Sequence, residues 1–563
     1  MFQPLSEYPR PQLQRSSYLC LNGEWEYAIR KFKRVPDEFD GKIIVPFSPE
    51  MEASGVQKTV MPDEFLFYKY EFDIPKEYRI HKIFLHFGAV EQIVVVIING
   101  SAVGKHVGGF LPFEFDIHSY IKEHNELIVR VKDVSDSSHF SRGKQRLNRG
   151  GIWYTPQSGI YMPVWLEAVD RYYVKKLRIT PNIDKKCVQI TVYSDSKNVE
   201  IHLLHHVYKV RGNEEITIPI DDPILWSPEN PHLYYFVVKT EDDEVKSYFA
   251  MRKFSTIVDA RGFRRLALNN KPYFMKGVLD QGYYRLGGLT PSSDADYISD
   301  INTMKELGFN TLRKHIKIES LRWYYHCDRL GMIVWQDFVN GGSKYKFPII
   351  SFPLFTNIHL KDNQYKLFGR ENEEGRKLAL QEYNETMDLL YNSPCIGLWT
   401  IFNEGWGQFD AKKIYDWAKI KDPTRLYDHA SGWHDQGCSD TKSLHVYFKR
   451  VHMPTKAATK DRAIILSEAG GYTLPYKENV FSDKKFGYKM LKTSEQLVNE
   501  YSKFIHKDII KNIPKGLSAF IYTQLSDVED ELNGFITYDR KRIKVNKKDI
   551  AALNKLLDRF KVI

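Results

Sequence analysis

The sequence predicts a multidomain protein in which two β-sandwich domains precede a C-terminal (β/α)8 barrel. Three observations predict this architecture. The chain has 563 residues, which at roughly 150 residues per domain corresponds to three or four domains. Its first half alternates short apolar runs with turn residues, whereas the chain after Pro272 alternates apolar runs with helical patterns. Because alternating strands and helices favour a parallel sheet covered by helices, we expect an α/β domain only in the C-terminal part.

Two β-rich segments make up the first half of the chain. In residues 1–170 short apolar runs have the spacing of a sandwich or jelly roll, and the run at 93–98 ends at Asn99-Gly100, a strong hairpin signal. In residues 171–257 the pattern repeats on a smaller scale, with residues 188–192 and 234–238 among the strands. We therefore expect two β domains, the second a small sandwich.

Residues 258–563 are expected to form the barrel. Helical patterns begin at Ser292-Ser293-Asp294 and end at Gly308, cover 321–330 before Gly331, and cover 376–391 before Ser393-Pro394. Eight apolar runs are the strand candidates: residues 274–279, 309–312, 332–335, 396–402, 425–429, 444–448, 464–467 and 517–522. Their number and spacing favour a (β/α)8 barrel. The alternative is an open doubly wound sheet, but the sequence lacks both G-x-G-x-x-G and G-x-x-x-x-G-K-[ST] phosphate loops.

Composition and charge exclude several classes of protein. Apolar residues are 42% and charged residues 27% of the chain, unlike a disordered or collagen-like protein. The net charge of +10 is modest and interspersed with acids, so polyanion binding is a weak hypothesis, and we interpret the basic run at 540–544 as a solvated face. Residues 1–10 lack an export signal, and no run approaches the ~20 apolar residues of a membrane span. We expect a soluble, cytoplasmic protein.

The cysteines indicate neither a disulfide framework nor a metal site. They are odd in number and widely spaced, without a Cys-x-x-Cys pair: Cys20, Cys187, Cys327, Cys395 and Cys438. We expect buried thiols in a reducing compartment. Zinc spacing and an EF-hand loop are absent from the sequence, so we expect no required cofactor.

Two glutamates follow predicted barrel strands and are the leading catalytic candidates. Glu404 follows the run at 396–402, and Glu468 follows the run at 464–467. Because barrel chemistry lies at the C-terminal ends of the strands, both carboxylates are expected at the mouth. Either one alone could be a cap or an ion-pair partner. Together they indicate glycoside hydrolysis, in which one acid protonates the leaving oxygen and a second carboxylate attacks or activates water.

Four sequence segments, taken together, resemble glycoside hydrolase family 2, which includes β-galactosidases, β-glucuronidases and β-mannosidases. They are the residues 21–25 (LNGEW), 99–113 (NGSAVGKHVGGFLPF), 158–167 (SGIYMPVWLE) and 403–407 (NEGWG). The resemblance runs from near residue 8 to the C-terminus. It implies a jelly-roll sugar-binding domain, an immunoglobulin-like sandwich and a catalytic barrel that hydrolyses β-glycosides with retention. It also implies that Glu404 is the acid/base and Glu468 the nucleophile.

The resemblance implies roles for further residues near these glutamates. Asn403 matches a residue that reaches the sugar 2-hydroxyl. Alternatively, Asn403 could only form the turn at the end of the strand. Arg313 matches an arginine that keeps the nucleophile ionised. Tyr447 matches a tyrosine that orients the nucleophile, the alternative being barrel packing. The family histidine stands three residues after the arginine, whereas His315 stands two after, so His315 could equally be a loop or core residue.

A second rank of candidates follows the first, third, fifth and eighth strands. We expect hydrogen bonding or stacking with sugar from Asp280, Gln281, Trp335, Asp337, Trp433 and Tyr522. Either aspartate could instead cap the next element. Tyr522 occupies the region where the family commonly has a tryptophan platform. Some relatives use cations, so a weak cation site stays open.

The sugar is the least determined property. Family members that act on glucuronic acid tend to carry Asn-x-Lys after the eighth strand, whereas this chain has Asn533-Gly534-Phe535. A glucuronide is therefore disfavoured, and we expect a β-galactosidase, with β-mannosides, β-glucosides or an arabinose-type sugar as alternatives. The expected partner is a carbohydrate, with no nucleic acid or membrane, and a homo-oligomer stays open. A catalytically silent carbohydrate-binding protein and a basic polyanion-binding protein are the rival classes.

Overall fold

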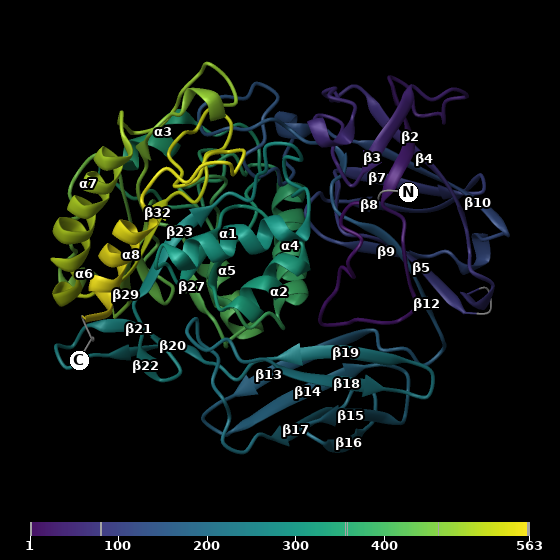
Figure 1. The fold of residues 1–563 in the computed structure, drawn as a ribbon, viewed down its shortest axis with the longest axis horizontal. Helices are drawn as coiled ribbons and strands as arrows, with labels where there is room; N and C mark the ends of the chain where they lie inside the picture. The colour runs from purple at the N-terminus through teal and green to yellow at the C-terminus, as the bar shows by residue number, and fades with distance from the viewer. Residues whose placement is uncertain (1–2, 79–80, 355, 357, 460, 560–563) are drawn as a thin grey trace.

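The computed structural model describes residues 3–78, 81–354, 356, 358–459 and 461–559, which form two β domains beside a barrel (Figure 1). The first domain is a sandwich of two antiparallel sheets plus a two-stranded pair. One sheet contains β3 (Gly41–Val45), β2 (Gly23–Arg30), β4 (Phe65–Asp73), β10 (His124–Lys132), β7 (Ile93–Ile98) and β8 (Ser101–Val107). The other contains β1 (Tyr18–Cys20), β12 (Val164–Val169), β5 (Lys82–Phe87) and β9 (Phe113–Asp116), and the pair is β11 (Gly159–Ile160) with β6 (Val90–Glu91).

Period-two patterning explains the core of this sandwich. In β7 every second residue is buried, and Val94, Val96 and Ile98 pack with Leu127 and Val129 of β10. The predicted turn at Asn99-Gly100 joins β7 to β8, and both residues have positive φ, the conformation required by a tight hairpin. The jelly-roll expectation for the first domain is confirmed.

The second domain is a smaller sandwich, as predicted. Its sheets contain β13 (Lys176–Asn182), β14 (Cys187–Tyr193) and β17 (Glu215–Pro219), and β16 (His206–Val210), β15 (Val199–Leu203), β18 (Tyr234–Lys239) and β19 (Glu244–Phe249). A third small sheet follows, formed by β20 (Phe254–Val258), β21 (Arg264–Leu268) and β22 (Lys271–Pro272). The expected domain boundary between residues 257 and 258 cuts β20, because β20 pairs with β21.

Eight parallel strands form the barrel, and they lie where the apolar runs predicted them. In chain order they are β23 (Met275–Asp280), β24 (Thr311–Lys314), β25 (Ile333–Asp337), β26 (Ile396–Thr400), β27 (Leu426–Asp428), β28 (Thr441–Val446), β29 (Ala463–Gly470) and β32 (Leu517–Thr523). Their residues are almost all buried, as expected when a parallel sheet is covered on both faces. Backbone ladders join every neighbouring pair except β27 and β28. There the Thr441 hydroxyl donates to the Tyr427 carbonyl at 3.1 Å.

The helices surround the barrel unevenly. They are α1 (Asp294–Glu306), α2 (Leu321–Leu330), α3 (Phe347–Ser351), α4 (Glu373–Leu390), α5 (Ala411–Lys421), α6 (Lys456–Thr459), α7 (Ser494–Phe504) and α8 (Lys547–Leu556). The predicted helix start and stop residues are found where expected. Ser293 forms a capping box at the start of α1, and α2 ends at Gly331, which has a φ of 76°. Residues 429–440, between β27 and β28, contain no helix, and α6 has only 4 residues. The helical layer is therefore thin beside β28 and β29.

The structure also bears on the expectations about the cysteines and about membrane-spanning segments. All five cysteines are buried free thiols, as predicted. Among the described residues, no helix has the length and apolarity needed to cross a membrane.

A loop of the first domain, residues 133–158, docks on the mouth of the barrel. Arg142 is buried and donates a hydrogen bond to the carbonyl of Gly342, while its backbone N–H donates to the carbonyl of Asn340 at 3.0 Å. Ser141 forms a β-bridge with Gly341, and its hydroxyl donates to Glu382 of α4. These contacts hold the loop against the catalytic end of the barrel.

We predict that Arg142→Ala loosens this loop. The change removes the side-chain hydrogen bond to the buried Gly342 carbonyl, which should lower the free energy of unfolding by about 1–3 kcal/mol. Limited proteolysis should then cut faster within residues 133–158. Arg34→Ala, which changes an exposed arginine of the same domain, is the control. Equal cleavage rates in both variants would contradict the docking role.

Candidate active site

Arg313 lies at the centre of a polar cluster inside the C-terminal end of the barrel. Successive side chains of a strand point to opposite faces, so in β24 Arg313 points into the barrel and Lys314 points toward the helices. The Arg313 guanidinium donates to both carboxylate oxygens of Asp337 at 2.9 Å and to Asn403 Oδ1 at 2.9 Å. It also donates to the Ser467 carbonyl at 3.1 Å and to Glu468 Oε2 at 3.4 Å. One buried cation therefore joins residues of four strand ends.

Glu468 is held as a carboxylate. Burial by itself raises its pKa, but His445, His315, Arg313 and Lys144 together lower the pKa well below its usual range. Of these groups, Arg313 is charged at every accessible pH. The other carboxylate oxygen, Oε1, accepts hydrogen bonds from the Tyr447 hydroxyl and, at 3.2 Å, from the Thr523 hydroxyl. These contacts hold an ionised carboxylate in one position, which is where Tyr447 and Arg313 were expected to act.

Glu404 lies across the barrel mouth from β29 and close to Glu468. It follows β26 with a φ of 51°, a left-handed conformation that is costly for a residue with a side chain and is concentrated at functional sites. Its Oε1 is 2.8 Å from His445 Nε2, and the same nitrogen is 3.9 Å from Glu468 Oε2. The two carboxylate oxygens are therefore no farther apart than the sum of these distances. The structure brings the two predicted glutamates together.

His445 is a site residue that the sequence analysis missed. It is fully buried on β28, and although burial lowers its pKa, Glu468 and Glu404 raise the pKa above its usual value. A protonated His445 between the two carboxylates offsets their repulsion. The sequence does contain a pattern that could have identified His445. It precedes Tyr447 by two residues, so the two side chains share one face of the strand.

Several buried polar atoms at the mouth have no hydrogen-bond partner within the described chain. They are Asn403 Nδ2, Gln281 Oε1, Trp406 Nε1 and Trp433 Nε1. Buried polar atoms are normally paired, so a group of unpaired ones at a single site indicates a missing ligand. Donors and acceptors in this number suit a molecule rich in hydroxyl groups. The placement agrees with the expectations for Asn403, Gln281 and Trp433, whose contacts with sugar stay predictions.

His315 and Asp337 lie at the site but in supporting positions. His315 Nδ1 is 2.8 Å from Asp337 Oδ2, and burial keeps the pKa of His315 well below its usual value. Asp337 uses both oxygens on Arg313 and His315. It therefore positions Arg313, and the expected direct hydrogen bond from Asp337 to sugar stays a prediction.

The structure contradicts three second-rank expectations, each because of side-chain direction. Tyr522 points out of the barrel and packs against Tyr501 of α7 and Phe535, while the next residue, Thr523, points inward. Trp335 points inward but lies one layer deeper, where its Nε1 donates to the sulfur of Met275 at 3.2 Å. Asp280 points toward the helices and pairs with Lys314 at 2.7 Å. These three residues therefore support the barrel and do not face a sugar.

Lys144 of the docked loop is the second residue that the sequence analysis missed. Its ammonium is buried beside the site, 3.9 Å from Glu531 Oε2 and 5.8 Å from the ring of Trp406. It is one of the cations that lower the pKa of Glu468. No motif places residue 144 near residue 468, since the contact exists only because one domain docks on the other.

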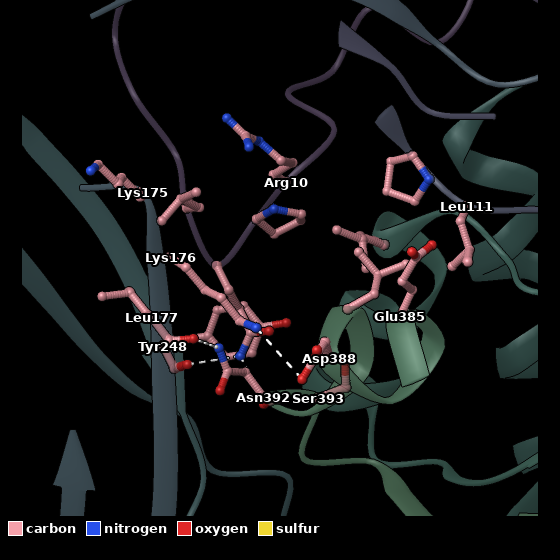
Figure 2. Close-up of a pocket in the computed structure, with 16 residues that line it drawn as sticks. Arg10, Leu111, Lys175, Lys176, Leu177, Tyr248, Glu385, Asp388, Asn392 and Ser393 are labelled. Carbon is pink, nitrogen blue, oxygen red and sulfur yellow. Dashed lines mark hydrogen bonds and ion pairs between the residues drawn. The ribbon is translucent and has the colours of Figure 1, made fainter. Parts of the chain in front are cut away.

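Cavities elsewhere in the molecule do not include the two glutamates. The cavity in Figure 2, about 350 Å³ in volume, lies where the N-terminal segment, the second sandwich and α4 meet, with Arg10, Leu177 and Asp388 on its walls. Gln12, Asn392 and backbone carbonyls bridge the three parts there. This cavity is a domain junction. Among the described residues, no three His, Cys, Asp or Glu side chains are grouped as a metal site, and the expectation about cofactors stays a prediction.

Comparison with protein families covers most of the chain. Residues 259–478 match "Glycosyl hydrolases family 2, TIM barrel domain", residues 19–167 match the sugar binding domain of that family, and residues 172–252 match "Glycosyl hydrolases family 2". These three segments follow one another in the order of the three observed domains.

Comparison with curated relatives and comparison with solved structures each give further similarities. A β-galactosidase of Thermoanaerobacter pseudethanolicus is 25% identical over 62% of this chain and 46% of its own length, and one of Vibrio cholerae is 23% identical over 78% and 46%. The chain thus spans less than half the length of these relatives. The β-D-glucuronidase structure of Dictyoglomus thermophilum has a TM-score of 0.75 at 18% identity, covering 98% of this chain and 99% of that one. A β-galacturonidase of Eisenbergiella tayi has a TM-score of 0.71 at 18% identity, with 98% and 99% covered.

We predict that Arg313→Gln raises the pKa of Glu468 toward its ordinary value, because the permanent cation that favours the carboxylate is lost. The carboxylate should then be protonated as the pH falls through a higher value than in the wild type. Carbon-13 NMR titration of glutamate-labelled protein measures this pKa. Arg322→Gln, which removes an arginine paired with Asp294, should leave Glu468 unchanged. The same pKa in all three proteins would contradict the role of Arg313.

Proposed function

The chain belongs to glycoside hydrolase family 2, and from this premise we propose that it is a retaining β-glycosidase with Glu468 as nucleophile and Glu404 as acid/base. The proximity of both carboxylates to one histidine nitrogen, at 2.8 and 3.9 Å, is the observation that supports this most. Double displacement requires carboxyl groups about 5–5.5 Å apart, whereas inversion leaves room for a water at about 6.5–9.5 Å. A closely spaced pair supports direct attack on the sugar.

The proposed reaction has two steps. Glu468 attacks the anomeric carbon while Glu404 donates its proton to the leaving oxygen, which breaks the glycosidic bond and forms a glycosyl ester on Glu468. Glu404 then removes a proton from water, and the water oxygen displaces Glu468 and releases the sugar. The lowered pKa of Glu468 supplies the ionised nucleophile, and the unpaired Asn403 Nδ2 is in position to donate to the 2-hydroxyl.

For the sugar we propose a β-galactoside. The curated relatives reported above are named β-galactosidases. In addition, the position where glucuronate-specific members tend to carry a lysine is occupied by Phe535, which is fully buried against Tyr522 and Phe309. Phe535 has no charge with which to pair a sugar carboxylate.

A uronide is the second candidate, because a different cation lies at the site. The ammonium of Lys144 is close to Trp406 and Glu531 and makes no hydrogen bond within the described residues. A buried ammonium of this kind could pair with a sugar carboxylate. The solved structures reported above, a β-glucuronidase and a β-galacturonidase, favour the same candidate.

We predict that Glu468→Ala abolishes turnover and that azide restores it, forming a glycosyl azide of inverted configuration in the space left by the carboxylate. Glu404→Ala should slow hydrolysis of substrates with poor leaving groups by roughly 10² to 10⁴, and should slow glycosyl-enzyme formation much less when the leaving group is activated. Wild-type rates in both variants would refute the assignment. Sugar binding by the wild type without turnover of any glycoside would support a silent carbohydrate-binding protein instead.

We also predict that, in a panel of nitrophenyl β-glycosides, the galactoside has the highest kcat/KM. Lys144→Gln should then change kcat/KM by a similar factor for every neutral sugar of the panel. If the glucuronide or galacturonide is fastest, and Lys144→Gln lowers kcat/KM for the uronide about tenfold more than for the galactoside, the second candidate is correct and the first is wrong.

A further inference from the structure

A trench runs down the side of the barrel from the rim of the active site. It exists because α6 has only 4 residues, so a full helix does not cover this side. The opposite wall is α7 and its π-helical continuation η7 (Ile505–Ile510), at the edge of the barrel in Figure 1. Two cavities of about 470 and 810 Å³ lie along it and share Arg450, Val451 and Asp508 as lining residues. They therefore form one continuous depression.

The upper end of the trench is aromatic and touches the catalytic centre. Tyr447, which donates to Glu468, lines this end together with Tyr488, and the two rings stack at 4.0 Å. Phe448 follows at the rim, 66% exposed, with its ring edge-on to Tyr488 and a φ of 60°. An exposed aromatic ring held in a costly backbone conformation indicates a ligand contact. The apolar face of a sugar ring is a suitable partner for it.

The lower part of the trench is basic. Lys503, Lys507, Lys511 and Lys515 are spaced four residues apart and are all exposed, so they lie roughly 6 Å apart along a helical path. Lys503 pairs with Glu500. The three others line the lower cavity and have no ion-pair partner among the described residues. Across the trench the Lys456 ammonium lies over the ring of Phe263 at 5.6 Å.

Two basic residues outside the trench are neutralised by ion pairs. Within the run that the sequence analysis interpreted as a solvated face, Arg540 is partly buried and pairs with Asp300, and Lys544 is buried and pairs with Asp527, whereas Lys541 and Arg542 are exposed. In the trench itself Asp508 is used by Arg450. Positive charge that is left unpaired on several neighbouring lysines attracts an anionic partner.

We propose that this trench binds an acidic oligosaccharide, with about one carboxylate per sugar residue, that forms the leaving-group side of the hydrolysed glycoside. The inference rests on the proposed glycosidase function and extends it to a substrate class. The aromatic end next to Glu468 contacts the sugar nearest the cleaved bond, and the lysines contact the following residues. The lysine spacing is comparable to the length of one pyranose residue, which fits a single charge on each residue better than dense sulfation.

The test compares binding with small-substrate turnover. In the inactive Glu468→Gln background, isothermal titration with hexagalacturonate should give binding that weakens about tenfold when Lys507→Gln and Lys511→Gln are added, because two exposed charge contacts are lost. With Glu468 intact, the same lysine changes should leave kcat/KM for a neutral nitrophenyl β-glycoside unchanged. The matched control is Lys541→Gln with Lys548→Gln, which removes two exposed charges elsewhere and should leave the hexagalacturonate affinity unchanged.

The outcomes separate this inference from the proposed function. If hexagalacturonate does not bind, or binds equally well to the trench and control variants, the trench proposal fails even though wild-type turnover of aryl glycosides upholds the glycosidase. Cellohexaose, which is neutral, should bind at least about tenfold more weakly than hexagalacturonate. Equal binding of cellohexaose, of a heparin hexasaccharide or of single-stranded DNA would show that the trench does not select a carboxylated oligosaccharide, and would overturn the proposal.

Discussion

The buried guanidinium of Arg313 is the interaction on which the rest of the site depends. A cation in the interior of a barrel is stable only if its donors are satisfied and opposite charge is near. Asp337, Asn403, the Ser467 carbonyl and Glu468 meet both conditions. The same hydrogen bonds join β24, β25, β26 and β29 and keep Glu468 ionised. Stability of the barrel end and the charge state of the proposed nucleophile therefore have one common cause.

The domains act on this centre together. The first sandwich supplies the loop that docks through Ser141 and Arg142 and brings Lys144 to the mouth. The short α6 has the opposite effect, because it leaves the side of the barrel open beside Tyr447. The proposed substrate path follows from these two features. In that proposed path, two domains would enclose the sugar, and the leaving-group side would continue along the basic wall of the trench.

The structure brings the leading site candidates together at the C-terminal ends of the strands, whereas side-chain direction separates some second-rank candidates from them. Glu404, Glu468, Arg313, Asn403 and Tyr447 come together as expected. Tyr522, Trp335 and Asp280 were predicted to be site residues only because they lie near a strand end. The alternation of side chains along the strand points Tyr522 and Asp280 out of the barrel, and Trp335 lies one layer below the site. His445 could have been found from its two-residue spacing to Tyr447, whereas Lys144 had no such signal.

The sequence alone determined the properties that depend on neighbours along the chain. Strands, most helices and the order of three domains follow from periodicity, from caps such as Ser293 and from terminating residues such as Gly331, because those interactions span only a few residues. Tertiary structure decided what depends on distant contacts. The shared position of Glu404 and Glu468 beside His445, the lowered pKa of Glu468 and the arrival of Lys144 arise from charges and hydrogen bonds between segments far apart in sequence, which no local pattern encodes.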